Sequence, residues 1–151
     1  MKRIIILILC FLICTASYGQ GKISEEALKA AFIFHFFNFV EWSDHQENFY
    51  VCIPDDEALR EVAAQELADK IVNQRKVVVV EHSDGCHVLI SNDPGQTETT
   101  LTIGSLNKGA MLEFRIIDHK LKFAISPQHI KESKLKISSQ LLKLAIVDHE
   151  V

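Results

Sequence analysis

Residues 49–90 read FYVCIPDDEALREVAAQELADKIVNQRKVVVVEHSDGCHVLI, and this stretch decides the fold class. The apolar run Phe49–Ile53 ends at a proline, and apolar residues then recur at helical spacing over residues 59–71. Two further apolar runs follow, at Lys76–Glu81 and at Cys86–Ile90. Strands that alternate with helices pair in parallel through crossover connections. The stretch therefore predicts an α/β protein with a largely parallel sheet.

The residues that follow are predicted to extend this sheet and to add an antiparallel hairpin. Thr99–Ile103 is a fourth expected strand, and Ala110–Ile117 and Lys120–Ser126 are expected to pair as a hairpin. A last helix is expected over Ser139–Val147. Because no repeat or linker interrupts residues 20–151, we predict a single domain with a mixed, mostly parallel sheet flanked by helices.

The segment before the first strand is the most aromatic part of the chain. Lys29–Trp42 reads KAAFIFHFFNFVEW, and we expect one helix from Ser24, a natural N-cap, to Trp42. A helix on one sheet needs only one apolar stripe, but here aromatic residues extend around the helix. Two interpretations remain open: the helix is enclosed between the sheet and the last helix, or part of it contacts a partner or a second copy of this chain. The candidate contact residues are Phe34, Phe37 and Trp42.

The first nineteen residues have the three parts of a secretory signal peptide. Lys2 and Arg3 precede the apolar run Ile4–Cys14, and small and polar residues then lead to Ser17 and Gly19 before the predicted cut. The apolar run is too short to span a bilayer comfortably as a helix. We therefore expect residues 1–19 to be removed and residues 20–151 to be exported.

Removal of residues 1–19 changes both the net charge and the number of thiols. The net charge moves from −4 to −6, because two basic residues and no acidic residues are lost, and nucleic acid is consequently a poor partner. Cys52 and Cys86 remain, in strands that the crossover order places side by side. An oxidising compartment favours a disulfide between them, and the alternative is two buried free thiols.

The sequence contains no pattern typical of an active site. The segment Asp55-Asp56-Glu57 after the first strand lacks glycine and has the wrong charge for phosphate, which argues against a nucleotide site. The seven histidines show no zinc-binding spacing, and we expect all of them at the surface or half-buried. Cys86 and His87 are neighbours in a strand and face opposite sides, so they cannot act as nucleophile and base. We therefore expect no enzyme activity, no metal and no cofactor.

The chain resembles the YfiR family of small periplasmic bacterial proteins. The most specific similarity lies in the aromatic helix that ends with Phe39-Val40-Glu41-Trp42 and in the tail LKISSQLLKLA at Leu135–Ala145. The family usually has a proline after this tryptophan, where this chain has Ser43. Between these segments the resemblance continues in the right order through Cys52, Cys86–Ile90, Leu101–Gly104, Gly109, Met111 and Phe114.

The resemblance implies a non-enzymatic regulator located in the periplasm. The best-understood role in the family is to bind the periplasmic sensor part of an inner-membrane diguanylate cyclase and to hold that enzyme inactive; similar domains are fused to sensor kinases. The alternative is a periplasmic module that binds a small molecule or senses redox state, unrelated to cyclic-di-GMP. A neighbouring gene for a membrane cyclase or kinase would favour the regulator.

Overall fold

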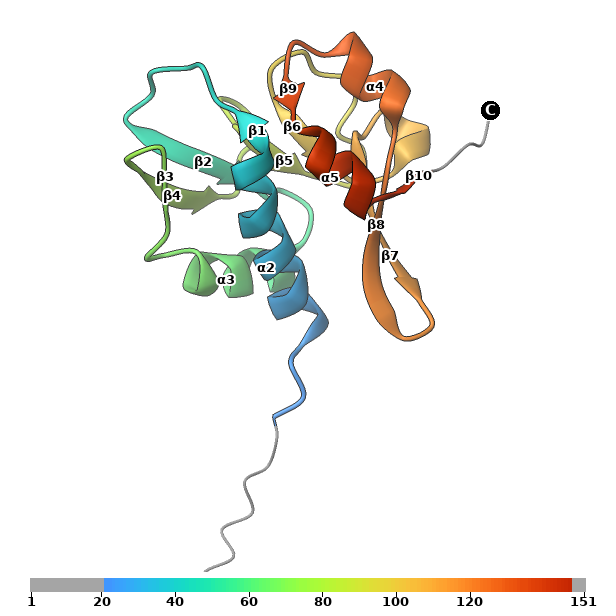
Figure 1. Ribbon diagram of the computed structural model, residues 1–151. Coiled ribbons are helices and arrows are strands. Elements are labelled where there is room, and N and C mark those ends of the chain that lie inside the picture. Colours follow the sequence, from blue (N-terminus) through green and yellow to red (C-terminus); the bar gives the residue numbers. More distant parts are fainter. Residues whose placement is uncertain (1–20, 148–151) are drawn as a thin grey trace, which may run out of the picture.

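The computed structural model describes residues 21–147 as one α/β domain, and the predicted signal peptide, residues 1–19, lies outside the described residues. Within residues 21–147, eight strands form one mixed sheet in the order β10-β8-β7-β6-β5-β2-β4-β3 (Figure 1). The mixed, mostly parallel sheet predicted from the sequence is confirmed. Its parallel core contains β2 (Asn48–Cys52), β4 (Arg75–Val80), β5 (Val88–Ile90), β6 (Leu101–Ile103) and β7 (Leu112–Ile117).

Antiparallel pairs flank this parallel core on both sides. β3 (Ile71–Val72) pairs with β4, and β8 (Lys120–Ile125) pairs with β7 in the predicted hairpin. The hairpin turns at Asp118 and His119, whose φ angles of 52° and 61° suit a two-residue turn between twisted strands. The predicted C-terminal hairpin is therefore confirmed.

The order of the parallel strands creates a point where the chain reverses direction across the sheet. The chain goes from β2 to β4 on one side and then returns past β2 to β5 on the other side. From β5 it continues outward through β6 to β7. In open α/β sheets, ligands bind outside the carboxyl ends of the strands at such a switch point. Here the switch point lies between β2 and β5.

The connection from β4 to β5 is short and contains a disulfide. Residues 81–87 contain no helix and must cross β2, because β4 and β5 lie on either side of that strand. Cys86 in this connection is bonded to Cys52, the last residue of β2, with 5.8 Å between the two Cα atoms. The disulfide predicted from the sequence is thus present, and it holds the connection against the strand that it crosses.

The aromatic helix is shorter than the predicted range of residues 24–42. α2 (Glu25–Phe36) begins at Ser24, as predicted, and gives way to a single turn of 3-10 helix at Phe37–Phe39. The chain then becomes extended in β1 (Val40–Glu41), which pairs antiparallel with β9 (Lys136–Ile137) in a separate small sheet. This pairing buries Val40, so tertiary contacts override the helical spacing of the aromatic residues.

The predicted last helix, Ser139–Val147, is also too long. A short helix α4 (Pro127–Glu132) follows β8, and the final helix α5 covers only Ser139–Leu144. The chain then pairs with β8 in parallel as β10 (Ile146–Val147). Isoleucine and valine favour strands over helices, and the free edge of β8 supplies a partner for them. Leu141 of α5 is fully buried and joins the core.

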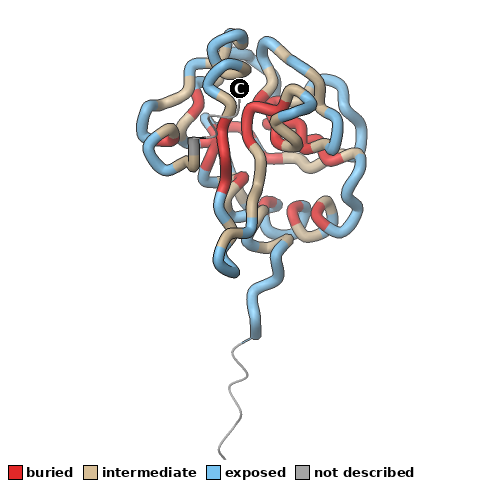
Figure 2. The backbone as a smooth tube through the Cα atoms, turned by 90° about the vertical axis from the view of Figure 1, so that its right-hand side faces the viewer, coloured by how far each residue is buried: buried red, intermediate tan, exposed pale blue. Residues whose placement is uncertain are grey.

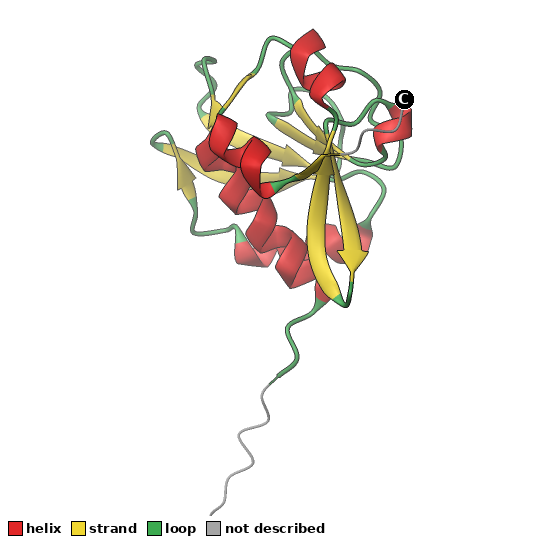
Figure 3. Ribbon diagram, turned by 45° about the vertical axis from the view of Figure 1, so that its right-hand side comes forward, coloured by secondary structure: helices red, strands yellow, loops and turns green. Residues whose placement is uncertain are grey.

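Helices α2 and α3 (Glu57–Glu66) pack against each other and contribute to one continuous core (Figure 3). Phe32 and Phe36 of α2 contact Phe114 and Phe123 of the hairpin, with ring centroids 4.9–6.2 Å apart. Burial is greatest in the middle of the sheet and falls toward the hairpin tip (Figure 2). In residues 21–147, no helix is both long enough and apolar enough to cross a membrane.

Candidate functional site

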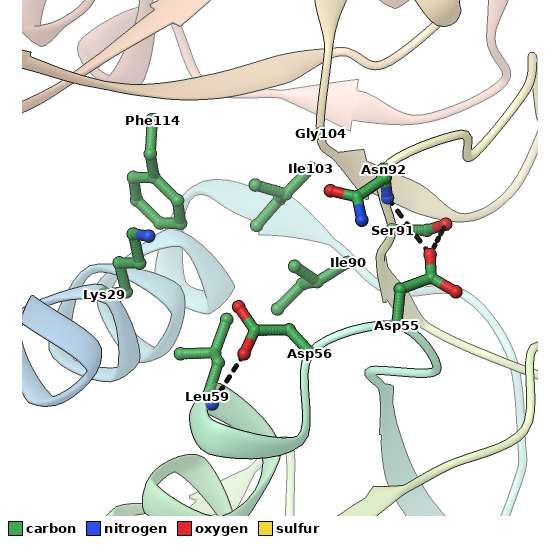
Figure 4. A pocket seen from close by; sticks show the side chains of 10 residues that line it. All are labelled: Lys29, Asp55, Asp56, Leu59, Ile90, Ser91, Asn92, Ile103, Gly104 and Phe114. Atoms are coloured by element: carbon green, nitrogen blue, oxygen red, sulfur yellow. Dashed lines mark hydrogen bonds between the residues drawn. The ribbon is translucent and has the colours of Figure 1, made fainter.

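An open cleft lies at the switch point, beyond the carboxyl ends of the parallel strands (Figure 4). The loops that follow β2 and β5 form one wall, and Lys29 of α2 and Phe114 of β7 form the other. The cleft has a volume of about 200 Å³. It combines apolar and polar lining residues: Lys29, Asp55, Asp56, Leu59, Ile90, Ser91, Asn92, Ile103, Gly104 and Phe114.

Two adjacent carboxylates in this cleft, those of Asp55 and Asp56, each accept hydrogen bonds through only one of their two oxygens. Asp55 Oδ2 accepts hydrogen bonds from the Ser91 hydroxyl and from the Asn92 N–H, so it joins the loop after β2 to the loop after β5. Asp56 Oδ1 caps α3 by accepting from the Leu59 N–H at 3.0 Å. The second oxygen of each carboxylate has no hydrogen-bond partner within residues 21–147. The cleft therefore presents negative charge to an incoming group.

The other polar lining residues hold the walls of the cleft in place. Lys29 pairs with Glu25 one helical turn away, at 2.7 Å. A Cβ at Gly104 would lie 2.1 Å from the backbone oxygen of Ser91, so only glycine permits this close approach of the two loops. Within residues 21–147, no group of three or more His, Cys, Asp or Glu side chains is arranged to hold a metal ion. The cleft thus has two carboxylates on one wall and the Lys29 ammonium on the other.

The opposite end of the same strands is closed by a polar cluster that consists of Asp44, Arg75 and His87. The Tyr50 N–H donates to His87 Nδ1 at 2.9 Å, so Nδ1 carries no proton and the ring proton lies on Nε2. Nε2 then donates to Asp44 Oδ1 at 2.8 Å, and Arg75 Nη1 donates to the same oxygen at 2.6 Å. His87 and Arg75 are only 4% and 8% exposed.

Aromatic rings surround this cluster and exclude water from one side of it. Phe49 stacks on His87 at 4.5 Å between centroids, and Trp42 makes T-shaped contacts with both rings. The guanidinium of Arg75 lies over the Phe49 ring at 5.5 Å. The cluster therefore has the character of a structural brace, in which Asp44 Oδ1 joins Arg75 to His87 and the aromatic rings pack against these two buried side chains.

The charge state of Asp44 depends on these neighbours. Partial burial raises the pKa of the Asp44 carboxyl, but hydrogen bonds from His87 and the Gln46 N–H, together with the charge of Arg75, outweigh that effect. The pKa of Asp44 consequently lies below its usual value of 3.8. Asp44 thus stays ionised at neutral pH and keeps its pairing with Arg75.

The three predicted contact residues differ in how deeply they are buried. Phe37 is 2% exposed and packs against Phe49, so it belongs to the core, and its assignment as a contact residue is wrong. Phe34 is half-buried, with its ring edge against Phe37 and the Lys70 ammonium 5.2 Å above it. Trp42 is half-buried too, and its indole N–H donates to the Phe37 carbonyl at 3.1 Å. Trp42 lies beyond the helix that was predicted to contain it.

Sequence reasoning also missed the polar cluster. All histidines were expected at the surface or half-buried, whereas His87 is buried. The available signal was its position inside the apolar run Cys86–Ile90, where a polar side chain needs a partner if the strand is internal. Asp44 and Arg75 gave no comparable signal, because each joins the cluster only through contacts between segments that are distant in the sequence.

These features define a small, disulfide-bonded α/β domain with a braced end and an open end. The chain belongs to the YfiR/HmsC-like family, whose model matches residues 26–146. The match confirms the resemblance found in the sequence. A comparison with curated proteins gives no match. The family is regulatory and periplasmic, and membership implies interaction with a membrane signalling protein.

Proposed function

We propose that this chain is a non-enzymatic periplasmic protein that binds the sensor part of an inner-membrane signalling protein and represses it. A diguanylate cyclase is the first candidate for this partner, and a sensor kinase is the second. The observation that carries the proposal is the family match over residues 26–146. The predicted export signal and the disulfide between Cys52 and Cys86 support a periplasmic location.

Repression of this kind needs no chemistry in the regulator itself. A protein that binds the inactive state of a receptor more tightly than the active state shifts the population toward the inactive state. A difference in affinity of a few kcal/mol is sufficient for a large shift. Phe34 and Trp42 remain proposed contact residues, because both are partly exposed and lie close to the end of α2.

The first test is the level of the second messenger in a strain that lacks the gene. If the protein represses a cyclase, deletion raises cyclic-di-GMP, and re-expression of the full chain lowers it again. A fall, or no change in a strain whose genome places a membrane cyclase beside this gene, would contradict the proposal. Pull-down of the mature protein from detergent-solubilised inner membranes, followed by mass spectrometry, would identify the partner.

A second candidate function is binding of a small molecule, and the open cleft at the switch point favours it. Its volume of about 200 Å³ lies below the range of sites for drug-sized ligands, so this function requires a small ligand. This function predicts that a small cationic metabolite raises the unfolding temperature of the wild type but not of Asp55→Asn. The disulfide would make a redox sensor only if reduction changed the regulatory output in cells.

A further inference from the structure

Strand β7 has an open edge over most of its length, on the side that faces β6. Its pairing with β6 is confined to Leu112, which lies opposite Ile103. β6 ends there, whereas β7 continues through Ile117 as one arm of the hairpin. At Phe114 and Ile116, the edge of β7 therefore has no strand beside it in the part of the chain that the structure describes.

Backbone groups on this edge are available for pairing. The Gly104 N–H donates to the Leu112 carbonyl at 2.9 Å, so the backbone of Leu112 faces β6. Alternate residues of a strand face the same side, and the N–H and C=O groups of Phe114 and Ile116 therefore point the same way. No hydrogen bond joins these groups to another residue of the described chain. Unpaired edges of this kind are templates for an added strand.

The other edges of the sheet are protected. The outer edge of β8 carries the exposed Lys120 and Lys122, and β10 covers the rest of it at Ala124 and Ile125. β3 at the far end has only two residues. Lysines, short strands and covering segments are the usual means by which proteins prevent edge pairing. β7 also carries Arg115, but beside it lies Ile116, which is 59% exposed.

The surroundings of the β7 edge indicate the chemistry of its occupant. Beside Ile116, the exposed side chains of Ile23 and Leu28 border a hollow of about 320 Å³ between the hairpin and the start of α2. In the other direction, Phe114 borders the cleft lined by Asp55 and Asp56, and the free oxygen of Asp56 points into it (Figure 4). An apolar group fits the hollow, and a basic group complements the cleft.

We propose that the open edge of β7 binds a short extended segment of the membrane partner as an added strand, a mode that rests on the proposed function. The segment carries an apolar residue for the surface formed by Ile23, Leu28 and Ile116, and a lysine or arginine for Asp55 and Asp56. Main-chain hydrogen bonds to Phe114 and Ile116 supply affinity, and the two side chains supply specificity. α2 and the loops after β2 and β5 border the cleft beside Phe114 of β7.

Proline substitutions test the backbone contribution with a matched control. Ile116 and Leu121 lie opposite each other in the hairpin, and the N–H of each points away from its hairpin partner strand. Ile116→Pro removes the outward donor of β7, and Leu121→Pro removes the corresponding donor on the outer edge of β8. Neither substitution removes a hydrogen bond of the hairpin. We expect Ile116→Pro to abolish repression, with second-messenger levels equal to those of the deletion strain, and Leu121→Pro to repress like the wild type.

A second pair of variants covers the case in which a proline variant does not accumulate. Ile116→Lys keeps the strand and places a charge on the proposed edge, and Ile71→Lys makes the same change at an isoleucine of β3 that is 66% exposed. We expect loss of repression for Ile116→Lys only. Immunoblots of the periplasm and thermal unfolding of each purified protein establish that the variants are folded.

The outcomes separate this proposal from the proposed function. Normal repression by folded Ile116 variants overturns the strand proposal but leaves the regulator intact, and equal loss in the control variants overturns it as well. A wild-type dimer that Ile116→Lys converts to monomers would show that a second copy occupies the edge, and the proposed occupant would be wrong. If deletion of the gene leaves the signal unchanged, the proposed function is wrong and the strand proposal falls with it.

Discussion

The two ends of the parallel strands differ in how deeply their polar side chains are buried: His87 and Arg75 are buried, whereas Asp55 and Asp56 are exposed. At the amino end, Asp44 accepts hydrogen bonds from Arg75 and His87, and Phe49 and Trp42 pack against the buried His87. At the carboxyl end, an open cleft and the β7 edge beside it expose carboxylate oxygens and backbone groups that have no hydrogen-bond partner within residues 21–147. One end has the features of a structural element, and the other has the features of a binding surface.

This difference has a physical cause in the topology. Ligand sites in open α/β sheets lie at the carboxyl ends of strands, where diverging connections leave a crevice. The amino end has no such crevice, so aromatic side chains can fill the space around a buried polar group. We therefore expect substitutions at the braced end to change stability and substitutions at the open end to change binding.

The largest expected loss of stability comes from the disulfide, which links the two ends. Cys52 directly precedes the loop of the open cleft, and Cys86 directly precedes His87 of the polar cluster. The bond closes a loop with a sequence separation of 34, so replacement of both cysteines by alanine should lower the free energy of unfolding by roughly 3–4 kcal/mol. Chemical denaturation of the oxidised wild type and the double variant measures this difference. Two free thiols in non-reduced periplasmic protein would contradict the prediction.

The next effect compares two phenylalanines near the end of α2. Phe37→Ser should destabilise by about 3 kcal/mol or more, because it leaves a cavity and a buried hydroxyl under Phe49. Phe34→Ser should cost about 1 kcal/mol, because that ring is half-exposed. Urea denaturation of both variants tests the assignment. Equal losses would mean that Phe34 is also a core residue and would remove it from the proposed contact surface.

A smaller effect, and one that depends on pH, is expected at Asp44. Because the folded protein lowers the pKa of this carboxyl, its contribution to stability is complete above the unfolded pKa of about 3.8 and disappears as the pH falls through the folded value. Asp44→Asn should therefore be less stable than the wild type at pH 7, and the difference should shrink below pH 4. Unfolding curves at pH 7, 5 and 3 measure it. A difference that grows in acid would contradict the assigned bonding.

The sequence could predict the class of the fold because its local signals agree with the final contacts. The alternation around residues 49–90 and the capping serine Ser24 correspond to elements that tertiary packing leaves unchanged. The ends of the aromatic helix and the last helix could not be predicted, because Val40 and Ile146 become extended only through pairing with distant strands. The candidate site depends even more on such contacts. Asp55 and Ser91 meet only because the strand order places β2 beside β5.

The smallest expected change in stability is at the open end, and it is the most informative about function. Asp55 is exposed, and an asparagine in its place keeps an oxygen that can accept from Ser91 and Asn92. Asp55→Asn should therefore change the free energy of unfolding by less than about 0.5 kcal/mol. Asp56→Asn should be similarly neutral, because asparagine is an equally good N-cap for α3.

The double variant Asp55→Asn/Asp56→Asn then removes the negative charge of the cleft while the fold is preserved. If the cleft receives a basic side chain, the double variant should lose much of its repression in cells, and the salt dependence of partner binding should decrease. Calorimetry or urea denaturation provides the stability, and the second-messenger level provides the function. A loss of more than 1 kcal/mol with normal repression would show that the two carboxylates brace the loops after β2 and β5. The distinction between a braced end and an open end would then no longer hold.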